Sequence, residues 1–350
     1  MKLFLFSRPA LFRALVALIL LLSGGLALAA DLKIATVAPE GSEWMKAHRA
    51  AAEKIRAQTE GRVVFKFYGG GVRGNDKKVL RLIRLGQLQG AAFTTSGLSE
   101  RYFDIVLYGL PFIFRSQDEV DYIRERFDAR LDAGLEEAGF VSFGFAGGGF
   151  ANFMSSSPIE SNNHLRGKKI WVPDGDLFSF TALESMNLSP VTLPVADVMT
   201  GLQTGLVDVI VTPPVGALLL QWYTKIGYVN PMPVAYTMGI LGIDKRAFDR
   251  LSEADQQVVS EVMRDTYQQL DAINRRDNVE AYEALLANGI KPSKSSADDV
   301  PYWREVAGTT NQKIWGEKAV DKSLYTDLLA ALDEYRAKHP QPDSIASAVQ

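Results

Sequence analysis

Side chains that carry out chemistry are sparse in this sequence and do not stand in catalytic patterns. The three histidines, His48, His164 and His339, are far apart, with no HExxH, no paired metal-ligand spacing and no nucleophile motif beside them. The chain has no cysteine, which excludes a disulfide framework and a thiolate zinc site. We therefore predict that the protein is not an enzyme and that it has no catalytic residues, no metal site and no cofactor.

Three glycines form the one motif with a well-known chemical partner. Gly69, Gly71 and Gly74 make a GxGxxG between a predicted strand and a predicted helix, where dinucleotide-binding proteins have their phosphate loop. The acidic residue expected about 20 residues further on is missing, because residues 89–95 read QGAAFTT. We interpret the glycines as a tight loop that lets a ligand or another lobe approach closely.

Residues 1–30 are typical of a removable export signal. Three cations precede the apolar stretch ALVALILLLSGGLALA, and we expect cleavage near Ala29 or Ala30, which places the mature protein in the periplasm. This segment carries three cations and no acid, so the net charge of −3 becomes about −6 without it. Such a charge opposes binding to nucleic acid or to anionic membranes. We expect a monomer.

Strands and helices alternate along the rest of the chain. The apolar patterns predict strands at 31–37, 62–68 and 90–95 with helices between them, and the same order recurs over 168–212. Alternation of this kind is typical of a parallel sheet covered by helices. We predict an α/β fold with two lobes, like that of periplasmic binding proteins, in which each lobe is a mostly parallel sheet with flanking helices.

The chain is expected to cross between the lobes twice. The glycine-rich stretch at 144–152 and the proline-containing stretch at 230–242 would form the crossings, the first with hinge-like backbone angles. A nearly continuous helical pattern from Ser252 to Asn288 is long enough to run along both lobes. The expected boundaries are 31–148 plus about 236–265 for lobe I, 149–235 plus about 266–340 for lobe II, and 341–350 for a frayed tail.

Binding in a cleft between the lobes is the function that this arrangement favours. Ligands of open parallel sheets lie beyond the carboxyl ends of the strands, and two facing sheets would enclose a ligand there by hinge closure. The side chains expected to line the cleft are Glu40, Ser42, Thr95, Ser96, Phe150, Asn152, Trp171, Asp174, Val195, Thr212, Pro213 and Tyr236.

The chain resembles the solute-binding subunits of tripartite ATP-independent periplasmic (TRAP) transporters of the dicarboxylate-binding type. The resemblance covers the whole mature chain, and it rests on the order and spacing of APEGS, GGGVRGNDKKVLRLIRLGQLQGA, YGLPFIFRS, LRGKKIWVP and ADVMTGLQTGLVDVIVTPP. It implies a periplasmic receptor that hands a small solute to the permease subunits of an ion-driven transporter.

The sequence departs from that family where the solute's carboxylate is usually held. The resemblance implies an arginine in the strand that ends KIRVP, and this chain has Trp171 there. A second arginine, after the first crossing, is replaced by Ala151, the usual Glu-Asn-Pro by Val211, Thr212 and Pro213, and an aromatic residue by Val195.

These replacements change the expected solute. An arginine offers a fork of charged donors, whereas a tryptophan offers one N–H and a large apolar face. We predict a neutral, aromatic or largely apolar solute rather than a small dicarboxylate. Alternatives are a cationic solute over Trp171 with Asp174 or Glu40 as counter-charge, and a carboxylate held by Arg73 or Arg101. A hydrophobe or lipid carrier with another partner and a periplasmic enzyme also remain open, as do the coupling ion and the oligomeric state.

Overall fold

The computed structural model describes residues 29–294 and 299–340, so residues 1–28 of the expected export signal and the whole expected frayed tail lie outside the described residues. Its order of elements follows the predicted alternation over the first 110 residues. These elements are β1 (Ala30–Thr36), α2 (Glu43–Gln58), β2 (Val63–Tyr68), α3 (Asp76–Arg84), β3 (Gly90–Thr94), α4 (Thr95–Leu98) and the 3₁₀ helix η1 (Phe103–Gly109).

The middle of the chain contains the recurrence and the first crossing. Its elements are α5 (Gln117–Glu137), β4 (Phe140–Val141), β5 (Phe145–Ser155), α6 (Asn162–Leu165), β6 (Lys169–Pro173), α7 (Leu177–Ser185), β7 (Ser189–Leu193), η2 (Val195–Asp197), α8 (Val198–Thr204), β8 (Val209–Thr212), α9 (Pro214–Leu219), η3 (Trp222–Lys225) and β9 (Tyr228–Val229). The last part has β10 (Ala235–Asp244), α10 (Lys245–Phe248), α11 (Glu253–Ala287), β11 (Lys291–Pro292), α12 (Asp299–Lys318) and α13 (Ser323–Lys338).

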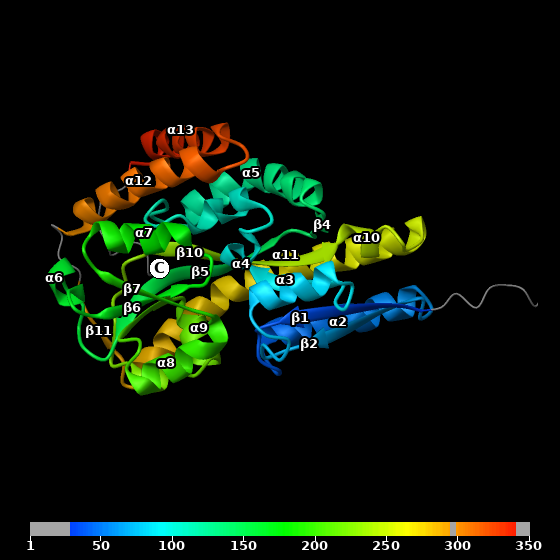
Figure 1. The fold of residues 1–350 in the computed structure, drawn as a ribbon, viewed down its shortest axis with the longest axis horizontal. Helices are drawn as coiled ribbons and strands as arrows, with labels where there is room; N and C mark the ends of the chain where they lie inside the picture. The colour runs from blue at the N-terminus through cyan, green and yellow to red at the C-terminus, as the bar shows by residue number, and fades with distance from the viewer. Residues whose placement is uncertain (1–28, 295–298, 341–350) are drawn as a thin grey trace, which may run out of the picture.

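The strands divide into two sets that share β5 and β10. The order along the sheet is β2-β1-β3-β10-β5-β8-β6-β7. Strand β1 lies parallel to β2 and β3, and β6 lies parallel to β7 and β8, whereas β10 and β5 run antiparallel to their neighbours. We call the side with β1, β2 and β3 lobe I and the side with β6, β7 and β8 lobe II; Figure 1 shows them at the right and left. The predicted fold class is confirmed.

The crossing strands are glycine-rich because they have no room for side chains. A Cβ on Gly147 would lie 2.1 Å from the Tyr236 hydroxyl oxygen, and one on Gly148 would lie 2.4 Å from the Thr237 hydroxyl oxygen. In the stretch 144–152, Gly144 and Gly149 have a positive φ, of +110° and +88°, and the register between β5 and β10 shifts beside Gly149. The sequence pattern indicated backbone freedom here, but close packing of two strands explains most of the glycines.

The long helix α11 joins the two lobes. It begins after Ser252, whose hydroxyl accepts from the backbone N–H of Asp255, and ends at Asn288, as the helical pattern predicted. Along its length it contacts α2 of lobe I, the crossing strand β5, and α9 of lobe II. It therefore runs the length of the molecule behind the sheet, as Figure 1 shows.

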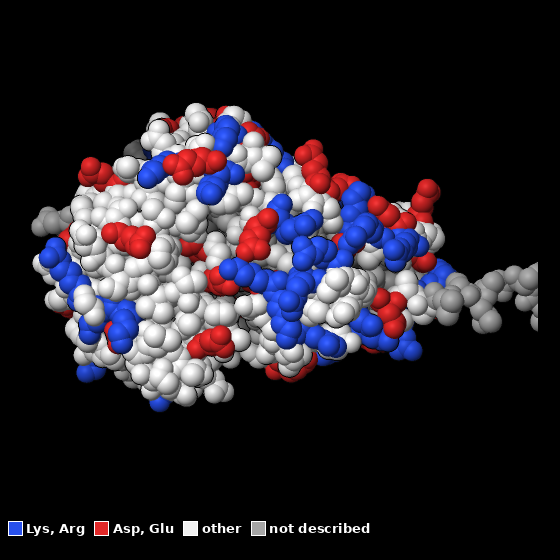
Figure 2. Space-filling model, in the orientation of Figure 1, with Lys and Arg blue, Asp and Glu red and all other residues white. Residues whose placement is uncertain are grey.

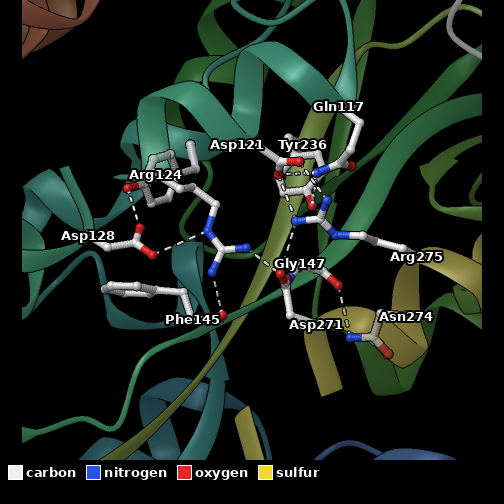
Figure 3. A network of polar contacts seen from close by, with 11 residues as sticks. Gln117, Asp121, Arg124, Asp128, Phe145, Gly147, Tyr236, Asp271, Asn274 and Arg275 are labelled. Carbon is white, nitrogen blue, oxygen red and sulfur yellow. Dashed lines mark hydrogen bonds and ion pairs between the residues drawn. The ribbon is translucent and has the colours of Figure 1, made fainter. Parts of the chain in front are cut away.

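A buried polar network fixes the start of β5 to α5 and α11. The guanidinium of Arg124 pairs with Asp271 at 2.7 Å and donates to the carbonyl of Phe145, while the Gly147 N–H donates to Asp271 at 2.7 Å (Figure 3). The side-chain amide of Asn274 donates to the carbonyl of Gly147. The first half of β5 thus belongs to a rigid block with lobe I and the long helix.

The described helices include none that is long and apolar enough to cross a membrane. On the face of the molecule drawn in Figure 2, basic side chains are concentrated on lobe I. Figure 2 shows basic side chains gathered over α3, while the face of lobe II is mostly uncharged.

Candidate ligand-binding site

A cavity of about 350 Å³ lies where the two sets of strand ends face each other. Its walls come from the loop after β1, from β3 and α4, from the crossing strands, and from the loops and helices that follow β6 and β8. The volume is within the lower part of the range of small-molecule sites. The cavity is therefore where the sequence placed the binding cleft, at the carboxyl ends of parallel strands.

The walls are apolar and contain no cation. Among the described residues that line the cavity there is no lysine, arginine or histidine, and Asp176 is its one carboxylate. The other polar groups are hydroxyls, on Thr36, Ser42, Thr94, Thr95, Ser96, Ser179, Thr212, Tyr236 and Thr237. The aromatic walls are Trp44, Phe93, Phe112, Phe153, Trp171, Phe178, Trp222 and Trp303, together with the ring of Tyr236.

Trp171 is part of the cavity wall but offers it no hydrogen-bond donor. Its side chain is 4% exposed, and its indole N–H donates to the carbonyl of Leu193 at 2.9 Å. Its ring meets that of Trp222 edge to face, with centroids 5.1 Å apart. Tryptophan has a single donor, so only apolar surface remains for a solute.

The positions at which the sequence is expected to depart from the TRAP pattern all line this one cavity. They are Ala151 on β5, Trp171 on β6, Val195 on η2 and the pair Val211 and Thr212 at the end of β8. These elements lie far apart in sequence and are brought together by the pairing of β5, β6 and β8. None of the five residues can carry a positive charge.

Eight of the twelve residues expected from the sequence line the cavity. They are Ser42, Thr95, Ser96, Trp171, Val195, Thr212, Pro213 and Tyr236. Buried Tyr236 receives a hydrogen bond from the side-chain amide of Gln117 at 3.2 Å, and burial raises the pKa of its hydroxyl to about 12. It is therefore a neutral hydroxyl at physiological pH.

The other four expected residues lie outside the lining. Glu40 is exposed and pairs with Arg49 at 2.6 Å. The side-chain amide of Asn152 is buried and donates to the carbonyl of Met232 at 3.0 Å. Phe150 packs against the ring of Tyr236, with centroids 5.1 Å apart, one layer behind the wall.

Asp174, the fourth, belongs to the mouth of the cavity rather than to its walls. Its carboxylate pairs with Lys77 at 3.0 Å, so this contact joins lobe II to lobe I. Beside it, the hydroxyl of Ser99 on lobe I donates to the carbonyl of Gly175 at 3.4 Å. The Pro-Asp-Gly-Asp turn after β6 thus rests on α3 and the residues after α4.

The two arginines considered as substitute carboxylate anchors also lie elsewhere. The guanidinium of Arg73 stacks over the Tyr68 ring at 3.8 Å from its centroid, beside a small neighbouring pocket. Arg101 donates to the carbonyl of Ala138 and faces the Phe140 ring. Neither lines the cavity.

Several residues of the cavity wall were not predicted from the sequence. Trp44, Trp222 and Trp303 come from α2, η3 and α12, and nothing in the local pattern separates them from core residues. Asp176 was missed as well, although its place at the end of the Pro-Asp-Gly-Asp turn and before an apolar helix is typical of an N-cap. The described residues contain no group of three or more His, Asp or Glu side chains placed to hold a metal ion.

The fold and cavity define a two-lobed solute-binding protein, and comparisons with known proteins give its family. Residues 34–318 match the family described as bacterial extracellular solute-binding protein, family 7. The chain belongs to this family, whose members are binding proteins rather than enzymes.

Individual relatives are distant. A solute-binding protein of Chromohalobacter salexigens is 24% identical over 311 residues, which cover 87% of this chain and 84% of that protein. The C4-dicarboxylate-binding periplasmic protein DctP of Rhodobacter capsulatus is 22% identical over 265 residues, covering 73% and 77% of the two chains.

Solved structures agree in fold. The sugar-acid-binding protein of Advenella mimigardefordensis, in complex with galactonate, has a TM-score of 0.80 at 19% identity, over 87% of this chain and 98% of that chain. A TRAP periplasmic solute-binding protein of Desulfovibrio salexigens with bound orotic acid has a TM-score of 0.79 at 18% identity, over 88% and 99% of the two chains.

Proposed function

We propose that this protein is an extracytoplasmic receptor that captures a largely apolar solute between its lobes and delivers it to the membrane subunits of a TRAP-type transporter. The family membership supports solute binding, and the cation-free cavity supports the solute class. The compartment would be the periplasm, reached by an export signal in residues 1–30. The lobes, with the boundaries given above, would close by rotation about β5, β10 and α11.

The observation that carries the solute class is the absence of any Lys, Arg or His among the described cavity-lining residues. A carboxylate moved from water into such walls would lose its hydration and gain no charged donor. Each charge-assisted hydrogen bond that is missing forfeits about 1.5–3 kcal/mol. Dicarboxylates, and the sugar acids that distant structural relatives bind, are therefore expected to bind poorly here.

Apolar solutes gain binding free energy from the same walls that disfavour a carboxylate. Burial of apolar surface contributes about 25 cal/mol per Å², and the aromatic side chains present broad faces for it. Trp171, Trp222 and Phe178 lie in the walls, so a solute with an aromatic or aliphatic body would make contacts on several sides.

A thermal-shift screen tests the proposed solute class. A ligand at 100 times its Kd adds about 2.7 kcal/mol of stability, which is readily measured as a rise in Tm. We expect compounds with apolar bodies to raise Tm, and succinate, galactonate and galacturonate to leave it unchanged. A rise with the carboxylates alone would overturn the solute class and leave only the receptor function.

A further inference from the structure

Among the residues that the structure describes, Asp176 is the one charged side chain in the cavity walls. Burial raises the pKa of its carboxyl, and hydrogen bonds from the first turn of α7 partly offset this effect. The backbone N–H of Ser179 donates to it at 3.0 Å. A carboxylate has about four acceptor positions, so the helix leaves part of this capacity available to a group inside the cavity.

The role of helix cap alone does not require a charge. Serine and asparagine cap helices about as well as aspartate, and the long helices α2, α3, α5 and α11 use Ser42, Asn75, Ser116 and Ser252. A charged cap in the wall of an apolar cavity carries a desolvation cost that a neutral cap would avoid. A cationic group of the solute would remove this cost by pairing with the carboxylate.

The two other acids that the sequence placed in the cleft are already paired. Asp174 is held by Lys77 at the mouth, and Glu40 is held by Arg49 on the surface. Neither is therefore the counter-charge for a bound cation. Phe178 and Ser179, two and three residues after Asp176, also line the cavity, so an apolar face and a hydroxyl lie near the carboxylate in the chain.

We propose that Asp176 selects solutes that carry a protonated amine on an apolar body, with the ammonium group bonded to its carboxylate and the body held by the aromatic walls. This inference rests on the proposed function and refines its solute class. A cavity of 150 Å³ accommodates benzene, so one of about 350 Å³ suits an amine of about 12–15 non-hydrogen atoms.

The experiment uses a library of matched trios, in which one aromatic or aliphatic skeleton carries an amine, an alcohol or a carboxylate. Tm shifts select the trios, and calorimetry gives each Kd for the natural sequence and for Asp176→Asn. Asparagine keeps the N-cap, so this variant removes the charge without removing the cap. We expect the amine to bind at least tenfold more tightly than its alcohol, and Asp176→Asn to abolish that difference while changing the Kd of the alcohol less than twofold.

Asp244→Asn is the matched control, because Asp244 also caps a helix, α10, but does not line the cavity. It should change neither Kd. The inference is overturned if no amine raises Tm, if the alcohols bind as well as the amines, or if Asp176→Asn weakens both members of a trio equally. If alcohols bind as well as amines, the role of Asp176 is wrong but the proposed function is unaffected. If only the carboxylate of each trio binds, the apolar solute class is wrong as well.

Discussion

Trp171 lies in the cavity wall with its single hydrogen-bond donor already used. Its N–H donates to the carbonyl of Leu193, and its ring packs edge to face against that of Trp222. The side chain therefore presents only apolar surface to the cavity. Sequence comparison alone identified the position, whereas the structure identifies how the indole is held.

We expect Trp171→Arg to destabilise the protein strongly. The guanidinium would replace a buried indole that packs on Trp222 in a largely apolar wall, and we expect a loss of about 3 kcal/mol or more in the free energy of unfolding. Trp171→Phe is the control, because it keeps an aromatic ring and loses mainly the bond to Leu193, for about 1 kcal/mol. Urea unfolding measures both. Equal stability of the two variants would contradict the burial of this side chain.

Eight of the twelve residues expected from the sequence line the cavity, and the reason is topological. Residues at the carboxyl ends of strands, such as Thr95, Trp171 and Thr212, must meet if the strands are parallel, so their spacing along the chain was sufficient. Trp222 and Trp303 could not be found this way, because their positions depend on how η3 and α12 pack. Glu40 and Asp174 follow the right strands, but the nearby cations Arg49 and Lys77 hold them outside.

At the scale of elements, the turn after β6 and the helix α3 form a contact between the lobes. The Lys77–Asp174 pair spans the mouth, and a Cβ on Gly175 would lie only 2.7 Å from the carbonyl oxygen of Ser96. Gly71 approaches the other lobe as well, because a Cβ there would lie 3.7 Å from the side chain of Ala196. The loop with the GxGxxG pattern thus serves lobe contact, which was one of the two uses predicted for it.

The pair of Lys77 with Asp174 should slow the release of a bound solute. An exposed ion pair contributes about 0.5–1 kcal/mol, so Lys77→Met or Asp174→Asn should speed release about two- to fivefold. The double variant should release no faster than the single variants, because both remove one interaction. Stopped-flow displacement of any solute found by thermal shift measures the rates.

Lys78→Met is the control for that measurement. Lys78 is an exposed neighbour on α3 for which the described residues give no ion pair. If Lys78→Met accelerates release as much as Lys77→Met, general charge on α3 and not the pair at the mouth controls release.

Asp76, at the start of α3, should make stability depend on pH. Burial, and then the nearby charge of Asp174, raise its pKa to about 6, while Lys77 and Arg73 are the cations on the same stretch. The folded protein then binds this proton more tightly than the unfolded chain, so stability from this group falls as pH rises from about 4 to 6. Asp76→Asn should raise Tm at pH 7.5 and have little effect at pH 4; an equal change at both pH values would contradict this assignment.

The fold was largely predictable at this scale because helix caps and strand periodicity are local signals. Ser42, Asn75 and Ser252 begin their helices as the sequence indicated. The crossing strands were located correctly, but their glycines were interpreted as hinges. The contacts of Gly147 and Gly148 with Tyr236 and Thr237 involve residues about 90 positions away, which no local pattern can show.

At the scale of the whole molecule, closure requires that some parts stay together while others rotate. The network around Arg124 joins α5, the first half of β5 and the middle of α11. Asn278 continues it, since its side-chain amide donates to the carbonyl of Gly148. Gly149, with its positive φ, lies at the end of this block, where a Cβ would come 2.5 Å from the side-chain nitrogen of Asn278, and rotation of lobe II is expected to begin beyond it.

Asp271 is the residue on which this block depends most. The side chains of Arg124 and Asp271 are 12% and 17% exposed, and Asp271 also receives the Gly147 N–H. Because removing one partner of a buried pair leaves an uncompensated charge, Asp271→Asn should cost about 3 kcal/mol in the free energy of unfolding. Asp128 remains beside Arg124 at 3.3 Å, so its negative charge partly compensates Arg124 and limits the loss of stability.

The triple variant Arg124→Met/Asp128→Asn/Asp271→Asn separates this charge effect from the loss of a contact. It removes Arg124 together with both carboxylates that pair with it, so urea unfolding should show it to be at least as stable as Asp271→Asn alone. The dependence of stability on pH gives a second measurement. Burial alone would raise the pKa of Asp271, but the charge of Arg124 and hydrogen bonds lower it below its usual value. The stability that this carboxylate contributes is therefore present above about pH 4 and is lost as pH falls through the lowered pKa. A single variant that costs less than about 1 kcal/mol would mean that β5 is held by packing alone, and that the lobes do not rotate about an electrostatically fixed block.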